Sequence, residues 1–293
     1  MSEDPAVVAR LRAAGCVFAE EEAGLLQEAA QTLDELESMI GQRVAGLPLE
    51  QVVGWAEFCG LRIHVEPGVF VPRRRSEFLV ETAVTLAAGH SPVIVDLCCG
   101  SGALGVAVAS KLDGGELHAA DVDPAAVACA RRNVETLGGP GVSPGERCGP
   151  TPDVVRGPGV SPGEALRVGP GRSPGHVYSG DLFAPLPQTL RGRVTTLLCN
   201  APYVPTGEIA LLPAEARDYE HRVALDGGDD GLAVLRRAAS GAPGWLAPGG
   251  HLLVETSGRQ AEAMADVMVA AGLEPAVHQC DDYGSAVVSA TLA

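Results

Sequence analysis

The sequence of 293 residues lacks any long apolar run, although 46% of its residues are hydrophobic. A membrane-spanning helix needs roughly 18 or more consecutive apolar residues, so we expect no transmembrane segment. The first ten residues, MSEDPAVVAR, have an acidic start and no apolar signal core. This pattern predicts a cytoplasmic protein with no secretion signal. The length suits one large domain plus a small one.

The patterns typical of metal sites and disulfide frameworks are also missing. The eight Cys residues form no C-x-x-C pair, and the seven His residues show no H-x-x-x-H spacing. Most of the cysteines lie in apolar runs. We therefore expect reduced thiols and no metal.

Basic residues are scarce: the chain has 21 Lys and Arg and 37 Asp and Glu. Aromatic residues make up only 4% of the chain. The net charge of −16 repels phosphate backbones, so stable nucleic-acid binding is not expected. The one basic run is Arg73, Arg74 and Arg75. It has two interpretations, an ion-paired turn or an anchor for an acidic partner.

The chain divides into three parts. Residues 1–51 are predicted to form a small helical domain. Asp4 is the expected helix cap, and apolar residues recur at helical spacing from Val7 to Leu33 and Ile40. Residues 52–75 form a predicted β-hairpin linker, since 52–72 alternate and contain Gly60 and Pro67-Gly68 as turn signals.

From residue 76 to the end, short apolar strands alternate with helices, which predicts an α/β domain with a mostly parallel sheet. The chain continues through helices expected at 102–112 and 124–137 and a final strand pair that includes an antiparallel edge strand. The expected strands are 93–97, 116–122, 176–179, 194–199, 250–255, 275–280 and 286–292.

Residues 138–175 interrupt this alternation. GPGVSPGE occurs at 139–146 and again at 157–164, and 19 of the 38 residues are Gly or Pro (11 Gly and 8 Pro). Such a segment buries too little apolar surface to offset the entropy of ordering it. It predicts a disordered insertion, with docking of a partner as an alternative role.

A glycine-rich turn follows the first strand, in VIVDLCCGSGALG. Gly100, Gly102 and Gly105 match G-x-G-x-x-G, and Asp121 lies 19 residues beyond Gly102, as in nicotinamide dinucleotide sites. However, Asp96 at the strand end would repel a pyrophosphate. A carboxylate there favours the ammonium and sulfonium of S-adenosylmethionine.

Two more acids end neighbouring strands. Asp121 would accept hydrogen bonds from both ribose hydroxyls. Asp181 would accept a hydrogen bond from the adenine amino group, with Leu182 and Phe183 as apolar walls. Each acid alone is also explained as a helix cap. Three acids at successive strand ends favour one adenosine-containing cofactor.

The run LLCNAPYVPT ends another strand with four residues suited to a flat polar group. The Asn200 side-chain oxygen and the Ala201 carbonyl would each accept one N–H of a planar amide or amine. Pro202 would hold Ala201 extended, and Tyr203 would stack on the flat group. This arrangement predicts methyl transfer to a planar nitrogen without a general base.

With these motifs, the chain resembles the protein-(glutamine-N5) methyltransferases of release factors, the HemK/PrmC family. The resemblance covers nearly all of the chain except the insertion and includes LPLEQVVGWAEFCGLRIHVEPGVFVPRRRSEFLVE, EHRVALDGGDDGL and LAPGGHLLVETSGRQ. It implies a Rossmann-like class I methyltransferase fold, S-adenosylmethionine as cofactor, and a Gly-Gly-Gln loop of a peptide-chain release factor as substrate. The family's functional positions correspond here to Cys98, Cys99, Gly100, Ser101, Gly102, Asp121, Asp181, Leu182, Asn200, Ala201, Pro202 and Tyr203.

The sequence departs from the family pattern at four positions. Cys98 stands for the usual first Gly and is expected to fit only where the backbone is not left-handed. Ala201 stands for Pro, and Arg74 and Arg75 stand for Pro and an acid near the expected partner surface.

We therefore predict a monomeric, S-adenosylmethionine-dependent protein glutamine methyltransferase. Three alternatives remain at this stage: methylation of an adenine amino group in nucleic acid or of another planar amine, a nicotinamide-dependent oxidoreductase, and a non-catalytic binding module that works through the insertion.

Overall fold

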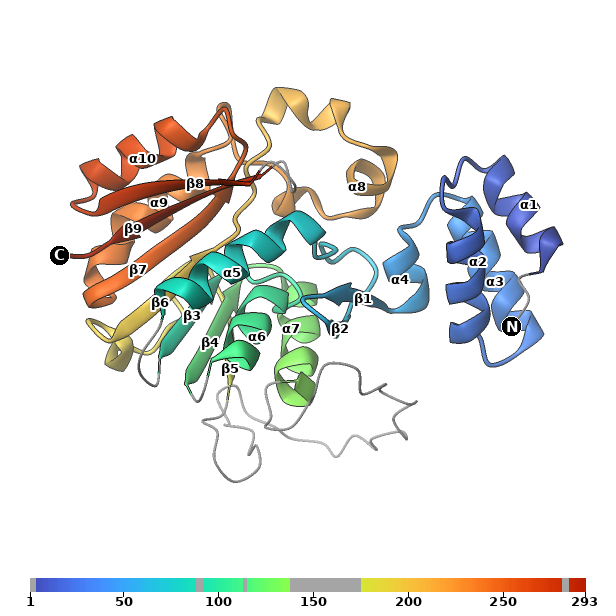
Figure 1. Cartoon of the computed structure of the whole chain (residues 1–293), viewed down its shortest axis with the longest axis horizontal. Coiled ribbons are helices and arrows are strands. Elements are labelled where there is room, and N and C mark those ends of the chain that lie inside the picture. The colour runs from blue at the N-terminus through green and yellow to red at the C-terminus, as the bar shows by residue number, and fades with distance from the viewer. Residues whose placement is uncertain (1–3, 88–91, 113–114, 138–174, 281–284) are drawn as a thin grey trace.

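The structure is a computed structural model that describes residues 4–87, 92–112, 115–137, 175–280 and 285–293. The predicted insertion therefore lies outside the described residues, apart from residue 175. A cluster of four helices stands at one end of the molecule, and a sheet covered by helices forms the other (Figure 1). No helix in the described ranges has the length and apolar character needed to cross a membrane.

The N-terminal helices pack around a small core of their own. They are α1 (Pro5–Ala13), α2 (Ala19–Ala29), α3 (Leu33–Val44) and α4 (Leu49–Val53). Asp4 caps α1 through a 2.9 Å hydrogen bond from the Ala6 N–H, as predicted. Leu11, Leu26 and Ile40 are fully buried. Leu33, which the periodicity placed on the apolar face, is 81% exposed because it is the first residue of α3.

A buried arginine of α3, Arg43, connects these helices to the rest of the chain. Arg43 Nε donates to Glu22 Oε2 at 2.6 Å, and both side chains are about nine-tenths buried, with 9% and 11% exposed. Arg43 Nη1 lies 2.7 Å from Glu215, which belongs to α8 (Ala214–Tyr219). The Tyr219 hydroxyl donates to the Ala45 carbonyl at 2.6 Å. The helical cluster is therefore held against α8 by a charged and a neutral contact.

The predicted hairpin forms over a shorter range, as β1 (Trp55–Phe58) and β2 (Leu61–His64). Its two-residue turn is Cys59-Gly60, with positive φ angles of 52° and 76°. Phe58 and Ile63 are fully buried against the α/β core. The chain then passes through a 3₁₀ turn, η1 (Arg74–Ser76), into α5 (Glu77–Leu86).

Seven strands form one sheet in the order β5-β4-β3-β6-β7-β9-β8. The strands are β3 (Val93–Leu97), β4 (Glu116–Asp121), β5 (His176–Ser179), β6 (Val194–Cys199), β7 (Leu246–Thr256), β8 (Glu274–Cys280) and β9 (Ser285–Thr291). The mostly parallel sheet was predicted, with one difference. The antiparallel strand is β9, which lies between β7 and β8 and not at the edge.

Helices cover both faces of this sheet (Figure 1). Alternate residues of the central strands point to opposite faces, so Leu197 and Leu252 join one core, and Leu198 and Leu253 join the other. The α/β helices are α5, α6 (Ala103–Lys111), α7 (Pro124–Leu137), α9 (Ala233–Gly241) and α10 (Ala261–Ala270). The remaining short 3₁₀ turns are η2 (Gln188–Leu190), η3 (Thr206–Leu211), η4 (Arg222–Ala224) and η5 (Ala242–Gly244).

The strand order reverses direction between β3 and β6. Crevices form at the carboxyl ends of strands where the order of an open parallel sheet reverses. Parallel pairing places Leu97 opposite Cys199. The turns that follow these two residues therefore meet at one edge of the sheet.

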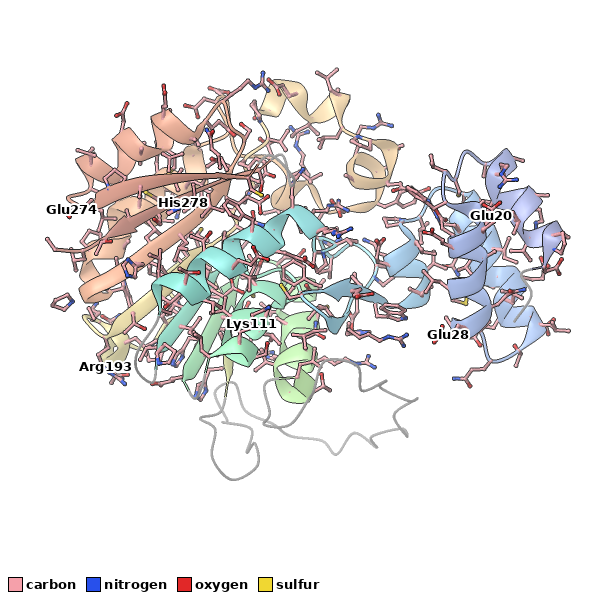
Figure 2. All side chains as sticks on the ribbon, viewed as in Figure 1. Glu20, Glu28, Lys111, Arg193, Glu274 and His278 are labelled. Atoms are coloured by element: carbon pink, nitrogen blue, oxygen red, sulfur yellow. The ribbon has the colours of Figure 1, made fainter. Side chains whose placement is uncertain are left out.

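We expect Glu22→Ala to lower the free energy of unfolding by about 3 kcal/mol, because it leaves the Arg43 guanidinium buried with only Glu215 and the Leu47 carbonyl as partners. The urea midpoint followed by circular dichroism measures this loss. Glu20, on the same helix (Figure 2), has a side chain that is 46% exposed and pairs with Arg12. Glu20→Ala is the matched control, with a loss of about 0.5 kcal/mol or less. Equal losses for the two variants would show that the buried ion pair contributes no more to stability than the exposed one.

Candidate functional site

A cavity of about 300 Å³ lies at the carboxyl ends of β3, β4 and β6. Its wall comes from Phe58 and from five stretches that are far apart in the sequence, at 68–76, 98–104, 121–126, 200–204 and 212–225. The size is at the lower end of the range for small-molecule sites. The glycine-rich turn, Asp121 and the Asn-Ala-Pro-Tyr run thus share one cavity.

The glycine-rich turn is fastened to the end of β4. The Gly100 N–H donates to Asp121 Oδ2 at 2.9 Å, and the Cys99 N–H donates to the Ala120 carbonyl at 3.1 Å. Gly102 has φ +77°, and a Cβ at this position would lie 3.2 Å from the Ala130 Cβ. Glycine is thus required here by both conformation and space.

Cys98 has a left-handed backbone conformation, with φ +54°. A thiol at position 98 was expected to fit only if the backbone there was not left-handed, so this expectation was wrong. A Cβ in the left-handed region costs roughly 1–2 kcal/mol. A hydrogen bond with the Cys199 thiol and burial raise the pKa of Cys98 well above its usual value. The side chain is therefore a neutral thiol that packs between β3 and β6.

Asp96 is fully buried under the turn and does not line the cavity. The prediction that it points into the crevice therefore needs correction. Its Oδ2 accepts from the Gly105 N–H at 2.9 Å, whereas its Oδ1 has no hydrogen-bond partner among the described residues. Burial raises the pKa of Asp96 to about 7, against the opposing effect of the Gly105 bond.

Asp121 ends β4 and lines the cavity. Its Oδ1 accepts a hydrogen bond from the Asp123 N–H at 2.9 Å, and its Oδ2 accepts the hydrogen bond from the Gly100 N–H. Burial raises the pKa of Asp121, and these backbone bonds oppose the shift. Each carboxylate oxygen keeps a free lone pair, so the group can accept two more hydrogen bonds from a ligand.

Asp181 and Leu182 lie outside the residues that line the cavity. The Asp181 side chain is 53% exposed and pairs with Arg237 of α9. Leu182 is buried in the main core with φ +47°, and Phe183 stacks on Trp245 at 5.5 Å between ring centroids. Asp181 follows Gly180, whose N–H donates to the Asp121 carbonyl at 2.9 Å, so the third acid ends the strand next to Asp121 although it does not line the cavity.

Asn200, Ala201, Pro202 and Tyr203 follow β6 and line the cavity next to Cys98 and Gly100. Asn200 Nδ2 donates to Ser76 Oγ at 3.3 Å and to Glu255 Oε2 at 3.5 Å. The Tyr203 hydroxyl donates to Glu255 Oε1 at 3.0 Å and accepts from Arg75 Nη2 at 2.6 Å. Burial, followed by the charge of Glu255, raises the pKa of Tyr203, so this phenol is neutral and is not a general base.

The basic run forms the ion-paired turn that was one of its two interpretations. Arg73 lies 2.6 Å from the buried Glu220 carboxylate, and Arg75 lies 3.2 Å from the buried Glu255 carboxylate. Arg74 is exposed. Of the three, only this middle arginine has no ion-pair partner among the described residues and presents its charge to solvent.

Sequence reasoning missed the buried polar residues that connect these segments. Glu255 is 1% exposed at the carboxyl end of β7, and Ser76 is 3% exposed. Asn133 of α7 donates to the Ser101 and His64 carbonyls at 2.8 Å, so it ties the hairpin to the glycine-rich turn. A signal existed for Glu255, because a lone acid interrupts the apolar run HLLVETSG where a strand ends.

The sequence predicts Asp226-Gly227-Gly228 as a turn and as the cap of a helix over 231–240, and the structure shows the turn without that cap. Asp226 accepts from the Gly228 N–H at 3.1 Å within the turn. Asp230 instead accepts from the Leu232 N–H at 3.1 Å, directly before α9.

The chain is similar to several known proteins. Residues 60–142 match the sequence profile of the family described as "Methyltransferase small domain". The release factor glutamine methyltransferase of Geobacter sulfurreducens is 34% identical over 226 residues, or 77% of this chain and 66% of that protein. Those of Moorella thermoacetica and Mycolicibacterium smegmatis are 35% and 34% identical, over 80% of this chain and 70% and 71% of their own lengths. The chain belongs to the release factor glutamine methyltransferase family. The family predicted from the motifs is thereby confirmed.

A solved structure shows the same fold. The methyltransferase from Pyrococcus furiosus superposes with a TM-score of 0.52 at 14% identity, over 79% of this chain and 89% of that one. This likeness confirms the predicted Rossmann-like class I sheet.

The raised pKa of Asp96 makes the stability of the protein depend on pH. Its pKa is raised above the unfolded value, so the stability it confers is present below about pH 4 and is lost as the pH rises to about 7. We expect the difference in unfolding free energy between Asp96→Asn and the wild type to shift by about 4 kcal/mol in favour of Asn from pH 4 to pH 8. Urea unfolding across this range measures it. Parallel stability curves for the two proteins would mean that Asp96 titrates normally.

Proposed function

We propose that this protein transfers a methyl group from S-adenosylmethionine to the side-chain amide nitrogen of a glutamine in a protein, with the Gly-Gly-Gln loop of a peptide-chain release factor as substrate. One observation carries the proposal. The Asn200–Tyr203 run lines the same cavity as the glycine-rich turn and Asp121. Membership of the release factor glutamine methyltransferase family supports the choice of substrate.

The residues around the cavity fit a cationic nucleoside cofactor. Asp121 offers free lone pairs to the ribose hydroxyls, and Cys98, Cys99, Gly100 and Ser101 form the adjoining wall. Below this wall, Asp96 adds a buried oxygen that has no hydrogen-bond partner in the described part of the chain, which favours a positive group nearby. When bound, S-adenosylmethionine supplies an electrophilic methyl group on a sulfonium.

The same residues suit a pyrophosphate poorly. The two arginines that line the cavity, Arg73 and Arg75, are already paired with Glu220 and Glu255. The buried Asp96 carboxyl lies under the glycine-rich turn, where a dinucleotide would place its phosphates. This charge distribution disfavours the nicotinamide alternative.

Asn200 and Ala201 would orient the acceptor nitrogen. The Asn200 Oδ1 and the Ala201 carbonyl each accept one N–H of the glutamine amide in our proposal. Two acceptors favour a nitrogen that has begun to pyramidalise and gain positive charge, and they favour it more than the planar ground state. Tyr203 stays a neutral phenol, so its ring bounds the amide while its hydroxyl remains bonded to Glu255.

Asp181 and Leu182 remain proposed cofactor residues, on the series of acids at strand ends and on the family resemblance. The Asp181 carboxylate pairs with Arg237, and both side chains are more than half exposed. An adenine amino group would have to share this carboxylate with the guanidinium.

A methylation assay with labelled S-adenosylmethionine tests the proposal, with purified release factor and total cell protein as acceptors. We expect label on the glutamine of the Gly-Gly-Gln loop, located by peptide mass spectrometry. Asn200→Ala should lower kcat at least 100-fold, on the order of 3 kcal/mol of transition-state stabilisation. Gln188→Ala, exposed and outside the cavity lining, is the control and should keep the wild-type rate.

Other outcomes of this assay would redirect the assignment. Label on a different protein would keep the chemistry and reject the release factor. Label only on added DNA or RNA would favour the adenine alternative. Thermal stabilisation by oxidised nicotinamide dinucleotide but not by S-adenosylhomocysteine would reject the methyltransferase proposal.

The left-handed Cys98 gives a separate test of the cofactor wall. We expect Cys98→Val to weaken S-adenosylhomocysteine binding about tenfold or more, because a β-branched side chain is strongly disfavoured at φ +54°. Cys98→Gly relieves the strain and should bind within about threefold of the wild type, as measured by calorimetry. Equal affinities for the Val and Gly variants would show that this turn does not shape the cofactor site.

A further inference from the structure

The Asn200 side chain is held from one side only. Its Nδ2 has two protein neighbours, Ser76 Oγ at 3.3 Å and Glu255 Oε2 at 3.5 Å. Its Oδ1 receives no hydrogen bond from the part of the chain that the structure describes. The amide therefore has its donor side turned to the protein and its acceptor side left for a ligand.

The two neighbours differ in what they dictate. A Ser hydroxyl can donate or accept, so Ser76 would bind either face of the amide. An ionised carboxylate only accepts, so Glu255 bonds the NH₂ and repels the carbonyl oxygen. Glu255 is thus the group that distinguishes the two orientations of Asn200.

The Glu255 carboxylate is itself held in place. Its side chain is 2% exposed, and its Oε1 receives the Tyr203 hydroxyl at 3.0 Å and Arg75 Nε at 3.2 Å. These two donors leave Oε2 for Asn200. Arg75 supplies the positive charge that a buried carboxylate needs. Segments from the η1 turn, β6 and β7 therefore converge on one amide.

We propose that Glu255 is a positioning residue that fixes the orientation of the Asn200 amide, so that Oδ1 faces the nitrogen to be methylated. The proposal rests on the function proposed above and deepens it. With the amide reversed, Nδ2 would face the N–H groups of the acceptor, donor against donor. The family resemblance assigned no role to Glu255, and its contacts here carry the inference.

Glu255→Gln tests this without opening a cavity. Arg75 and Tyr203 both donate to the Oε1 position, so the carbonyl oxygen of the introduced amide would take that place and its NH₂ would face Asn200. Asn200 then turns its Oδ1 toward this NH₂ and away from the acceptor. We expect kcat/KM for a Gly-Gly-Gln acceptor to fall about 10- to 100-fold, with S-adenosylhomocysteine affinity within about threefold of the wild type.

A second substitution separates orientation from general damage. When Asn200→Asp is combined with Glu255→Gln, one oxygen of the new carboxylate accepts from the introduced NH₂ and the other faces the acceptor. We expect the double variant to recover at least about tenfold over Glu255→Gln. Asn200→Asp alone places two carboxylates in contact and should be less active than the double variant. A purely structural role for Glu255 predicts no such rescue.

The orientation also has a readout that does not depend on methylation. The side-chain NH₂ resonances of Asn200, assigned by their loss in Asn200→Ala, should shift strongly in Glu255→Gln. Glu220→Gln is the matched control, since Glu220 is also a buried carboxylate paired with an arginine, Arg73, and its hydrogen bonds go to Val71 and Arg73 and not to Asn200. It should leave these resonances in place.

The outcomes are distinguishable. Unchanged kcat/KM in Glu255→Gln, unmoved Asn200 resonances, or a double variant no better than Glu255→Gln would each overturn the positioning role. If the wild type methylates no glutamine acceptor, the proposed function fails. In that case, the comparison of the Asn200 resonances still shows whether Glu255 determines the orientation of the Asn200 amide.

Discussion

The parallel pairing of β3 with β6 is the constraint on which the site depends. It sets Leu97 opposite Cys199, so the turns that begin at Cys98 and Asn200 leave the sheet side by side. About a hundred residues of chain separate them, and no local preference could bring them together. The apolar side chains of both strands, buried on both faces, supply the free energy that holds this register.

Buried carboxylates organise the surroundings of the cavity in two different ways. Glu220 and Glu255 are each neutralised by one arginine of the run 73–75, so this short turn joins the hairpin linker to α8 and to β7. Asp96 has no such partner and one oxygen without a hydrogen bond among the described residues. The protein thus neutralises the buried carboxylates on its acceptor side, whereas Asp96 and Asp121 on the proposed cofactor side have no ion-pair partner among the described residues.

Backbone conformation at the glycine-rich turn follows the fold and not the residue type. Gly100 and Gly102 have the positive φ angles that glycine favours, but Cys98 has one as well. The clamp from Asp121 to Gly100 and the bond from Cys99 to Ala120 hold the turn in this shape. A side chain that departs from the family pattern is therefore tolerated at the cost of local strain.

The sequence by itself determined the α/β class, most strand and helix ranges, the two motifs that line the cavity and the family. It could do so because burial on both faces, helix caps and glycine-rich turns are local patterns. The tertiary structure alone decided that Asp96 is covered, that Asp181 lies outside the cavity, that β9 lies inside the sheet edge and that Arg73 and Arg75 pair inward. It also decided that Glu255 and Ser76 meet Asn200. These facts depend on contacts between residues far apart in the chain, and such contacts leave no periodic signal in one sequence.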